Sequence, residues 1–375
     1  MPSPEKDALH IATALRLAAS ALLLTDPNPR VGCVLSDSEG RVLGQGHTQQ
    51  AGGPHAEVMA LRDAAAQGNS VEGATAYVTL EPCSHHGRTG PCCDALIAAG
   101  IRRVVASLAD PNPLVAGQGF ERLRAAGVEV EVGPGAAESR ELNIGFFSRM
   151  VRRKPWVRLK VAASLDGKSG LSNGVSQWIT AEAARADGHA WRARASAVLT
   201  GVGTVIEDNP RLDVRLVETP RQPHLVVVDS RMQTPPDAHL FIAGRAVWVY
   251  AASRDEAKAA ALEARGASVA CLANAHGKVD LPALMQDLAA RGVNELHVES
   301  GHKLNGSLLR EGCVDELLVY LAPKLIGDGL DIASHLHPDG ALTSLAGALP
   351  LEFKSADMLG PDLRVLARVA GRDVF

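Results

Sequence analysis

The first 132 residues alternate between helical and strand-like spacing of apolar side chains. Near the start, apolar residues between Ala8 and Leu22 recur every three or four positions, which predicts one buried face of a helix. Further helices are predicted at 55–68, 91–100 and 119–127. Short apolar runs bounded by turn residues predict strands at 30–37, 40–48, 73–82, 101–110 and 128–133. This alternation predicts helices packed on a mixed sheet.

A second α/β pattern follows a glycine-containing and then basic stretch at 133–156. Strands are predicted at 156–167, 195–201, 223–230, 246–252, 267–273, 294–301, 315–323 and 363–371. Intervening helices include 254–266 and 281–292. A chain of 375 residues is long for one core, so we predict two domains, 1–147 and 148–375. A loop inside one large domain is the alternative reading of the stretch between them.

Composition narrows the class of protein. Apolar residues make up 46% of the chain, and the net charge of −4 indicates no bulk attraction to nucleic acid or to an anionic membrane. Six cysteines are too few for a disulfide framework and fit a reducing cytoplasm. The apolar stretch 15–24 is too short to span a membrane and is predicted to be a core helix. We therefore expect a cytoplasmic protein, in which a local basic patch for a phosphate-bearing small molecule stays possible.

His55, Cys83 and Cys92 have the chemistry of a zinc site. A catalytic zinc keeps three protein ligands and one open position, whereas a structural zinc closes all four. Glu57 is a poor fourth ligand but is well placed to act as a general acid/base. An H-x-E motif followed by P-C and a later cysteine is the signature of zinc nucleobase deaminases.

Two alternatives remain open at this site. Cys93 neighbours Cys92, and one helical residue turns a side chain by about 100°, so only one of the two points inward; we assign Cys92. A closed structural zinc site, or a pair of buried thiols, is the second alternative. The structural site would need a fourth ligand.

The segments "TDPNPRVGCVL", "GPHAEVMAL" and "PCSHHGRTGPC", together with 110–133, resemble the deaminase half of bifunctional riboflavin-biosynthesis deaminase/reductases. The resemblance implies that Zn²⁺ is held by the three proposed ligands. The long insert between the two cysteines is characteristic of that family. Residues implied to contact the substrate are Asn28, His47, His85, His86 and Arg88. For the insert, a solvated polar loop is the alternative. Met59 departs from the pattern, because relatives often carry a second histidine there.

The second half carries weaker motifs of its own. The glycine turn at 201–205 lacks a third glycine, and 298–309 indicates a helix whose N-terminus suits a phosphate, or an ordinary βα turn. Together with 159–168, 176–185 and 197–215, these segments resemble the reductase half of the same family. That half is similar in fold to dihydrofolate reductase and uses NADPH. The resemblance implies cofactor contacts at Ala162, Trp178, Thr204, Asp208, Ser230, Gly301, His302, Lys303, Leu304, Asn305, Gly306 and Ser307.

The same resemblance implies substrate contacts at Ser176, Arg192, Leu212, Arg215 and Glu299. The two arginines suit a ribose 5-phosphate, because a planar guanidinium can bind two phosphate oxygens. Asp208 and Glu299 are candidate proton donors, with ordering of cofactor or ribose as the alternative role. A homodimer formed through the reductase half is also implied.

The predicted fold class is α/β, with an N-terminal cytidine-deaminase-like three-layer domain and a C-terminal dihydrofolate-reductase-like domain. The predicted function is hydrolytic deamination of 2,5-diamino-6-(5-phosphoribosylamino)pyrimidin-4(3H)-one to 5-amino-6-(5-phosphoribosylamino)uracil. NADPH-dependent reduction of the ribosyl chain to ribityl follows. The alternative is a nucleic-acid deaminase of the transfer-RNA adenosine type fused to an unrelated α/β domain. It predicts a short gap between the cysteines and a basic face.

Overall fold

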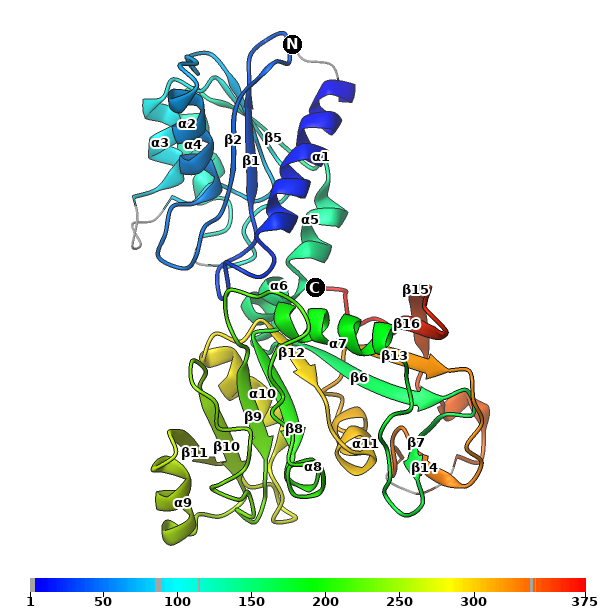
Figure 1. Cartoon of the computed structure of the whole chain (residues 1–375). Coiled ribbons are helices and arrows are strands. Elements are labelled where there is room, and N and C mark those ends of the chain that lie inside the picture. The colour runs from blue at the N-terminus through cyan, green and yellow to red at the C-terminus, as the bar shows by residue number, and fades with distance from the viewer. Residues whose placement is uncertain (1–3, 85–89, 114, 338–339, 341) are drawn as a thin grey trace. The chain divides into compact units, whose positions relative to one another are not determined.

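The computed structural model describes residues 4–84, 90–113, 115–337, 340 and 342–375. The chain divides into two compact units, Met1–Arg152 and Arg153–Phe375 (Figure 1). The boundary predicted at 147/148 lies inside helix α6 (Ile144–Arg152), and the compact units divide after that helix. Within the described residues, no helix is both long and apolar enough to cross a membrane.

The first unit is a five-stranded sheet with helices on both faces. The strand order is β2-β1-β3-β4-β5, with β1 antiparallel to β2 and β3 and the remaining pairs parallel. The strands are β1 (Gly32–Ser36), β2 (Val42–His47), β3 (Thr75–Val78), β4 (Arg103–Ala106) and β5 (Glu129–Val132). Helices α1 (Pro4–Ser20) and α5 (Ala136–Leu142) cover one face. Helices α2 (Ala56–Ala66), α3 (Cys92–Ala98) and α4 (Gln118–Ala125) cover the other, so the predicted three layers are present (Figure 1).

Glycines let the helices pack closely on this sheet. A Cβ atom at Gly32 would lie 1.9 Å from the carbonyl oxygen of Ala14 in α1. On the other face, a Cβ atom at Gly46 would lie 2.5 Å from the Cβ of Met59 in α2. No larger residue fits at either position without displacing a helix. The close approach of α2 fixes the position of its first turn, where Glu57 lies.

A buried ion pair joins α1 to the sheet. Both guanidinium ends of Arg103 donate to Asp7, at 2.9 and 2.8 Å, and the Tyr77 hydroxyl donates to the same carboxylate at 2.8 Å. Arg103 also contacts Glu131 at 2.5 Å, but that partner is half exposed. The pair satisfies a carboxylate that would otherwise be buried without a countercharge.

The second unit is built on a nine-stranded sheet with the order β11-β10-β9-β8-β12-β6-β13-β16-β15. Its strands are β6 (Trp156–Ser164), β8 (Ala197–Gly201), β9 (His224–Val228), β10 (Val247–Ala251), β11 (Ala267–Cys271), β12 (Glu295–Val298), β13 (Glu316–Ala322), β15 (Leu351–Leu359) and β16 (Asp362–Val369). The strands from β11 to β13 are parallel, and β16 and β15 continue the sheet antiparallel. The first strand of this unit, β6, therefore lies inside the sheet between β12 and β13.

The helices of the second unit are α7 (Glu182–Arg194), α8 (Val202–Asp208), α9 (Glu256–Glu263), α10 (Leu281–Ala290) and α11 (His302–Arg310), with a 3₁₀ turn at Leu345–Gly347. A separate two-stranded sheet pairs β7 (Lys168–Leu171) with β14 (Gly329–Asp331). Each strand predicted in this half is present. Strands β7, β14 and β15 were not predicted, since they are short or lack a buried apolar face.

Candidate active sites

The first candidate site lies where strand β1 begins and strands β2 and β3 end. Gly32, which begins β1, pairs with His47, which ends β2. The antiparallel register of β1 with β3 brings the end of β3 to the same end of the sheet. Cys83 follows β3 by a few residues and lies near His55, at the start of α2.

His55, Cys83 and Cys92 come together at this end of the sheet. Their ligand atoms lie within 4.8 Å of one another. The His55 Nδ1 atom is 3.6 Å from the Cys83 sulfur and 3.3 Å from the Cys92 sulfur. The backbone N–H of Cys92, at the start of α3, donates to the Cys83 sulfur at 3.3 Å, which favours a thiolate there. Among the described residues no fourth His, Cys, Asp or Glu joins the group. One nitrogen and two sulfurs are a donor set that fits a catalytic zinc ion.

Glu57 lies in the first turn of α2, two residues after His55, and is only 3% exposed. Burial, and after it the nearby charge of Cys83, raise the pKa of its carboxyl to about 7. A cation bound nearby would lower the pKa of Glu57. A carboxyl group whose pKa is close to neutral can both take up and release a proton.

Cys93 is turned away from the three ligands. Its thiol donates to the carbonyl of Pro82 at 3.1 Å and to that of Gly119 at 3.5 Å. The thiol is buried, and burial raises its pKa to about 12, so it stays protonated. This geometry agrees with the assignment of Cys92 over Cys93.

Glu81 is a buried residue of this site that sequence reasoning missed. Its carboxylate accepts the backbone N–H groups of Asp110 at 3.0 Å, Gly117 at 2.9 Å and Gly119 at 2.8 Å. These bonds tie Asp110, Gly117 and Gly119 to the chain that leads into Cys83. The signal was a charged residue at the end of an apolar strand, directly before Pro82.

Of the five predicted substrate contacts in this unit, Asn28 and His47 lie in the described part of the chain. The backbone of Asn28 is held by Thr25, which accepts its N–H at 2.9 Å and donates to its carbonyl at 3.1 Å. The His47 Nδ1 atom lies 3.2 Å from the side-chain amide of Gln49. The insert residues lie outside the described part of the chain, namely His85, His86 and Arg88.

The second candidate site is a cavity of about 2140 Å³ in the second unit. Ala162 lines it from the end of β6, Ser230 from beyond β9 and Glu299 from beyond β12. The cavity therefore opens at the carboxyl ends of parallel strands, where open α/β sheets bind ligands.

Nearly all residues predicted for this half line the cavity. The predicted cofactor contacts in its wall are Ala162, Trp178, Thr204, Asp208, Ser230, Gly301, His302, Lys303, Leu304, Asn305 and Ser307. The predicted substrate contacts in its wall are Ser176, Arg192, Leu212, Arg215 and Glu299. Gly306 is the exception. A Cβ atom there would lie 1.6 Å from the carbonyl oxygen of Ser334, so this glycine lets α11 pack on the chain at 334.

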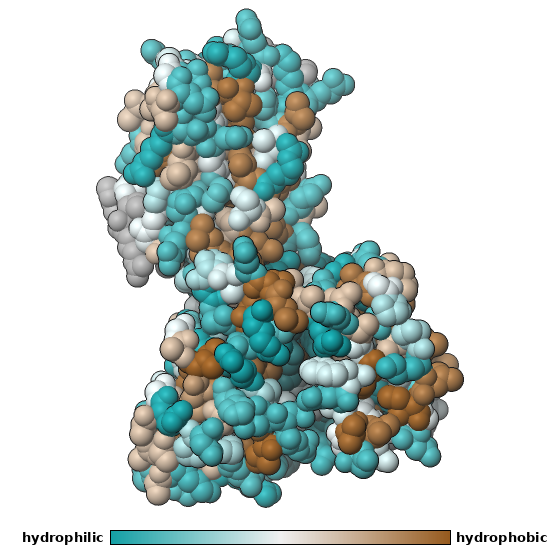
Figure 2. Space-filling view, viewed as in Figure 1, coloured by the Kyte–Doolittle hydropathy of each residue, from teal (hydrophilic) through white to brown (hydrophobic). Residues whose placement is uncertain are grey.

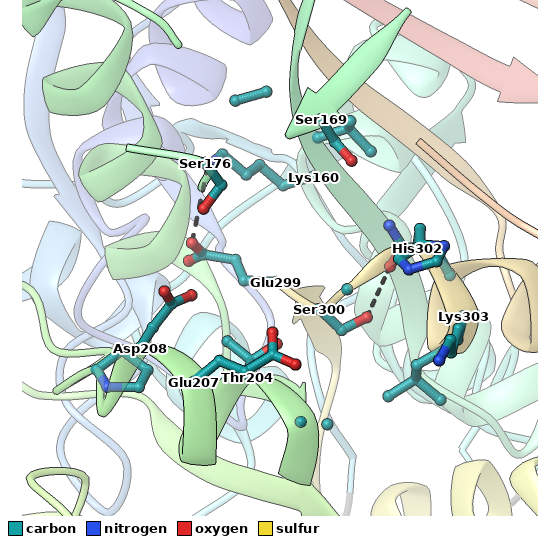
Figure 3. Close-up of a pocket in the computed structure, with 18 of the residues that line it drawn as sticks. Lys160, Ser169, Ser176, Thr204, Glu207, Asp208, Glu299, Ser300, His302 and Lys303 are labelled. Atoms are coloured by element: carbon teal, nitrogen blue, oxygen red, sulfur yellow. Dashed lines mark hydrogen bonds and ion pairs between the residues drawn. The ribbon is translucent and has the colours of Figure 1, made fainter. Parts of the chain in front are cut away.

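Glu299 is surrounded by cations. Arg192 donates to its two oxygens at 2.7 and 3.0 Å, and the Lys160 Nζ atom is 3.8 Å away. The Nε2 atom of the buried His297 is 3.4 Å from the same carboxylate. Burial alone would raise the pKa of Glu299, but these groups, Arg192 foremost, hold it well below its usual range. Figure 3 shows the Glu299 carboxylate directed toward Lys160 and Ser176.

Asp208 and Lys160 also line the cavity, and their pKa values shift toward the uncharged forms. Burial and the neighbouring Glu207 raise the pKa of Asp208, on α8. Burial lowers the pKa of Lys160, which Glu299 partly offsets. Lys160 was missed from the sequence, although a lysine within the apolar run 156–167 was the available signal.

The start of α11 is held in place by its own side chains. Gly301 is the residue before the helix, and the Ser300 hydroxyl donates to the Asn305 amide oxygen at 2.6 Å. The Asn305 side-chain N–H groups donate to the carbonyl of Ile332 at 2.8 Å. The exposed backbone N–H groups of this helix end, with Lys303 beside them, can bind an anion.

Comparisons with known proteins cover both units. Residues 4–108 match the family "cytidine and deoxycytidylate deaminase zinc-binding region", and residues 155–365 match the family "RibD C-terminal domain". Riboflavin biosynthesis protein RibD of Escherichia coli (strain K12) is 43% identical over 370 residues, covering 96% of this chain and 98% of that protein.

Solved structures agree with the sequence comparison. Acinetobacter baumannii RibD (form 1) superposes with a TM-score of 0.87 at 37% identity, covering 97% of this chain and 99% of that one. A diaminohydroxyphosphoribosylaminopyrimidine deaminase/5-amino-6-(5-phosphoribosylamino)uracil reductase from Thermotoga maritima gives a TM-score of 0.85 at 32% identity, with 98% and 99% coverage.

Proposed function

The chain belongs to the RibD family of bifunctional deaminase/reductases of riboflavin biosynthesis, and we propose which residues carry its two reactions. Residues 1–147 are assigned the deaminase and residues 148–375 the reductase. The alternative, a nucleic-acid deaminase fused to an unrelated domain, is wrong for this chain, because relatives of this family match both halves together.

For the deaminase, His55, Cys83 and Cys92 are proposed to hold Zn²⁺. The observation that carries this proposal is the convergence of their ligand atoms beside the buried carboxyl of Glu57. Zinc, when bound there, supplies a Lewis acid that lowers the pKa of water. Glu57 is proposed as the general acid/base that moves the proton to the leaving ammonia. The proposed substrate is 2,5-diamino-6-(5-phosphoribosylamino)pyrimidin-4(3H)-one.

For the reductase, the cavity of the second unit is proposed to bind NADPH and the deaminated product together. NADPH supplies the hydride that converts the ribosyl chain to ribityl. The helix end at Gly301–Lys303 suits the cofactor phosphates. Trp178 offers a 65% exposed indole, with the Arg185 guanidinium 4.8 Å from the ring centre. Arg215 is proposed to contact the substrate phosphate, and Lys160 and Glu299 to face its remaining polar groups.

A coupled assay tests both reactions in the full-length protein. With zinc, NADPH and the diaminopyrimidine phosphate, ammonia release and NADPH oxidation are both expected. Glu57→Gln should lower deamination by roughly 10²–10⁴-fold, the usual contribution of a general acid/base. The same variant should retain zinc and still oxidise NADPH when the aminouracil phosphate is supplied. Deamination that survives Glu57→Gln would remove the role proposed for that residue.

We also propose that the chain self-associates through its reductase half. Strand β15 lies at the edge of the nine-stranded sheet and exposes Leu351 (43%), Phe353 (79%) and Met358 (65%). Figure 2 shows apolar side chains gathered on the surface of the second unit. An unpaired apolar edge strand is a ready surface for a second copy. Light scattering should show a dimer for the wild type and a monomer for Phe353→Lys; a monomeric wild type would contradict this. The cytoplasmic location stays a prediction.

A further inference from the structure

The segment Arg211–Arg215, here called the strap, lines the reductase cavity without regular secondary structure. Side chains from other segments bind its backbone. The guanidinium of Arg245 donates to the carbonyls of Arg211 at 2.6 Å and Leu212 at 2.7 Å. The amide of Gln222 binds both the N–H and the carbonyl of Val214, at 2.8 and 3.0 Å. A loop that would otherwise be free to move is thus held in one conformation.

Helix α7 completes this set of contacts through two residues one turn apart. Arg192 donates to the carbonyl of Asp213. The backbone N–H of Arg215 donates to the Nδ1 atom of His189 at 3.2 Å. Residues three apart on a helix share a face, so His189 and Arg192 hold neighbouring backbone groups of the strap. His189 is 5% exposed and lines the cavity.

The two predicted phosphate-binding arginines therefore differ in what they offer a ligand. Arg192 is about 10% exposed in its side chain and binds Glu299 and the strap. The side chain of Arg215 is 51% exposed, and its guanidinium contacts Asp213 at 2.7 Å. Both arginines line the cavity, but Arg215 has the more exposed side chain, and its backbone N–H is held by His189.

The charge state of His189 agrees with this contact. Burial, and after it the nearby charges of Arg192 and Arg215, lower the pKa of His189 to about 4. The ring is therefore neutral near pH 7. Its Nδ1 atom keeps the lone pair that accepts the N–H of Arg215, and its proton is on Nε2.

We propose that His189 is a positioning residue of the reductase: it fixes the backbone of Arg215 so that this guanidinium meets the phosphate of the phosphoribosyl substrate. The inference rests on the proposed reductase function. It adds that recognition of the substrate phosphate depends on a neutral histidine that does not itself have to touch the phosphate. Pre-ordering of a binding group before the ligand arrives is what raises affinity here.

His189→Phe and His189→Asn separate this role from general packing. Phenylalanine keeps an aromatic ring but has no acceptor, whereas the asparagine side-chain oxygen can replace Nδ1 as the acceptor. His224 provides a matched control. Its Nδ1 atom accepts the backbone N–H of Ala246 at 3.1 Å, the same kind of bond, and it does not line the cavity.

The assay uses the full-length protein with saturating NADPH. KM and kcat are measured with 5-amino-6-(5-phosphoribosylamino)uracil and with the same compound lacking its phosphate. His189→Phe should raise KM for the phosphorylated substrate by about tenfold, the effect of losing one buried hydrogen bond. The kcat should stay within about twofold of the wild type, since the reacting atoms are not contacted. KM for the substrate without phosphate should not change.

His189→Asn should restore the wild-type KM, and His224→Phe should leave both substrates unaffected. An unchanged KM in His189→Phe, or an equal rise for both substrates, would overturn the positioning role. His189→Ala, which adds no bulk, is the second variant if His189→Phe does not fold. Absence of NADPH oxidation by the wild-type protein with the phosphorylated substrate would instead overturn the proposed function itself.

Discussion

Replacing Gly306 with alanine tests whether α11 is held against the cavity by its contact with the chain at Ser334. A Cβ atom at Gly306 would lie 1.6 Å from the Ser334 carbonyl oxygen, far inside any van der Waals contact. Helix and chain would therefore have to separate by roughly 2 Å. Two hydrogen bonds span the same contact: Ser334 N–H to the His302 carbonyl at 2.9 Å, and His302 Nδ1 with the Ser334 hydroxyl at 2.6 Å.

The expected cost follows from these contacts. A separation of that size breaks both hydrogen bonds, each worth about 1 kcal/mol net. Overpacking adds about 1–3 kcal/mol. The reductase unit should lose about 3–5 kcal/mol in total, which for a domain of this size lowers its Tm by roughly 10 °C. The displaced N-terminus of α11 should also weaken NADPH binding.

Thermal loss of reductase activity and NADPH titration by fluorescence measure the two effects. Deaminase activity in the same variant is an internal control, because that site belongs to the other unit. Gly203→Ala is the matched stability control, since a Cβ atom in this position of α8 meets nothing within 4 Å. It should stabilise slightly, by up to about 1 kcal/mol. A wild-type Tm for Gly306→Ala would refute the packing argument.

Further predictions concern the deaminase unit. Cys93→Ser should keep zinc and Cys92→Ser should lose it, as measured by metal analysis; a zinc-free Cys93 variant would reverse the ligand assignment. Asp7→Asn should destabilise this unit by about 3–5 kcal/mol, because it leaves Arg103 without its buried partner. Glu131→Gln should cost less than about 1 kcal/mol despite its shorter contact, because Glu131 is half exposed. Burial alone would raise the pKa of Asp7, but Arg103 and other hydrogen-bond donors lower it. The ionised Asp7 carboxylate therefore contributes fully to the free energy of unfolding when the pH is above the pKa that Asp7 has in the unfolded chain. This contribution is lost as the pH falls through the lower pKa that Asp7 has in the folded protein. The stability difference between wild type and Asp7→Asn should shrink below about pH 4, and a constant difference would contradict the linkage.

Local patterns predicted that His55, Cys83 and Cys92 come together, because these residues are close to one another in the sequence. Glu57 lies in the first turn of α2 and His55 directly precedes that helix, while Cys83 lies in the segment between β3 and α3, the helix that begins at Cys92. The choice between Cys92 and Cys93 also followed from helix geometry. Glu81 was missed because its partners are backbone N–H groups of Asp110, Gly117 and Gly119, and the sequence does not show that these groups lie beside it.

The reductase half was less predictable from local patterns, since its contacts are distant in sequence. Arg158 is buried in β6 with Glu295 of β12 at 3.1 Å and Glu316 of β13 at 2.6 Å. Charges inside a strand ordinarily indicate an exposed face, and only the sheet order shows that they compensate one another. The role of His189 was hidden for the same reason, because its partner is a backbone group of Arg215.

The strand order of the second unit has a consequence for how the chain folds during synthesis. The deaminase residues are contiguous and leave the ribosome first, so we expect that unit to fold before the rest of the chain. Strand β6 follows immediately, but its neighbours in the sheet, β12 and β13, begin at Glu295 and Glu316. Both edges of β6 therefore remain without their native partners until most of the chain has been translated. Such long-range pairing is slow and leaves apolar strand edges open to aggregation. A ribosome that stops between β6 and β12 would release a chain able to complete a deaminase but unable to complete a reductase.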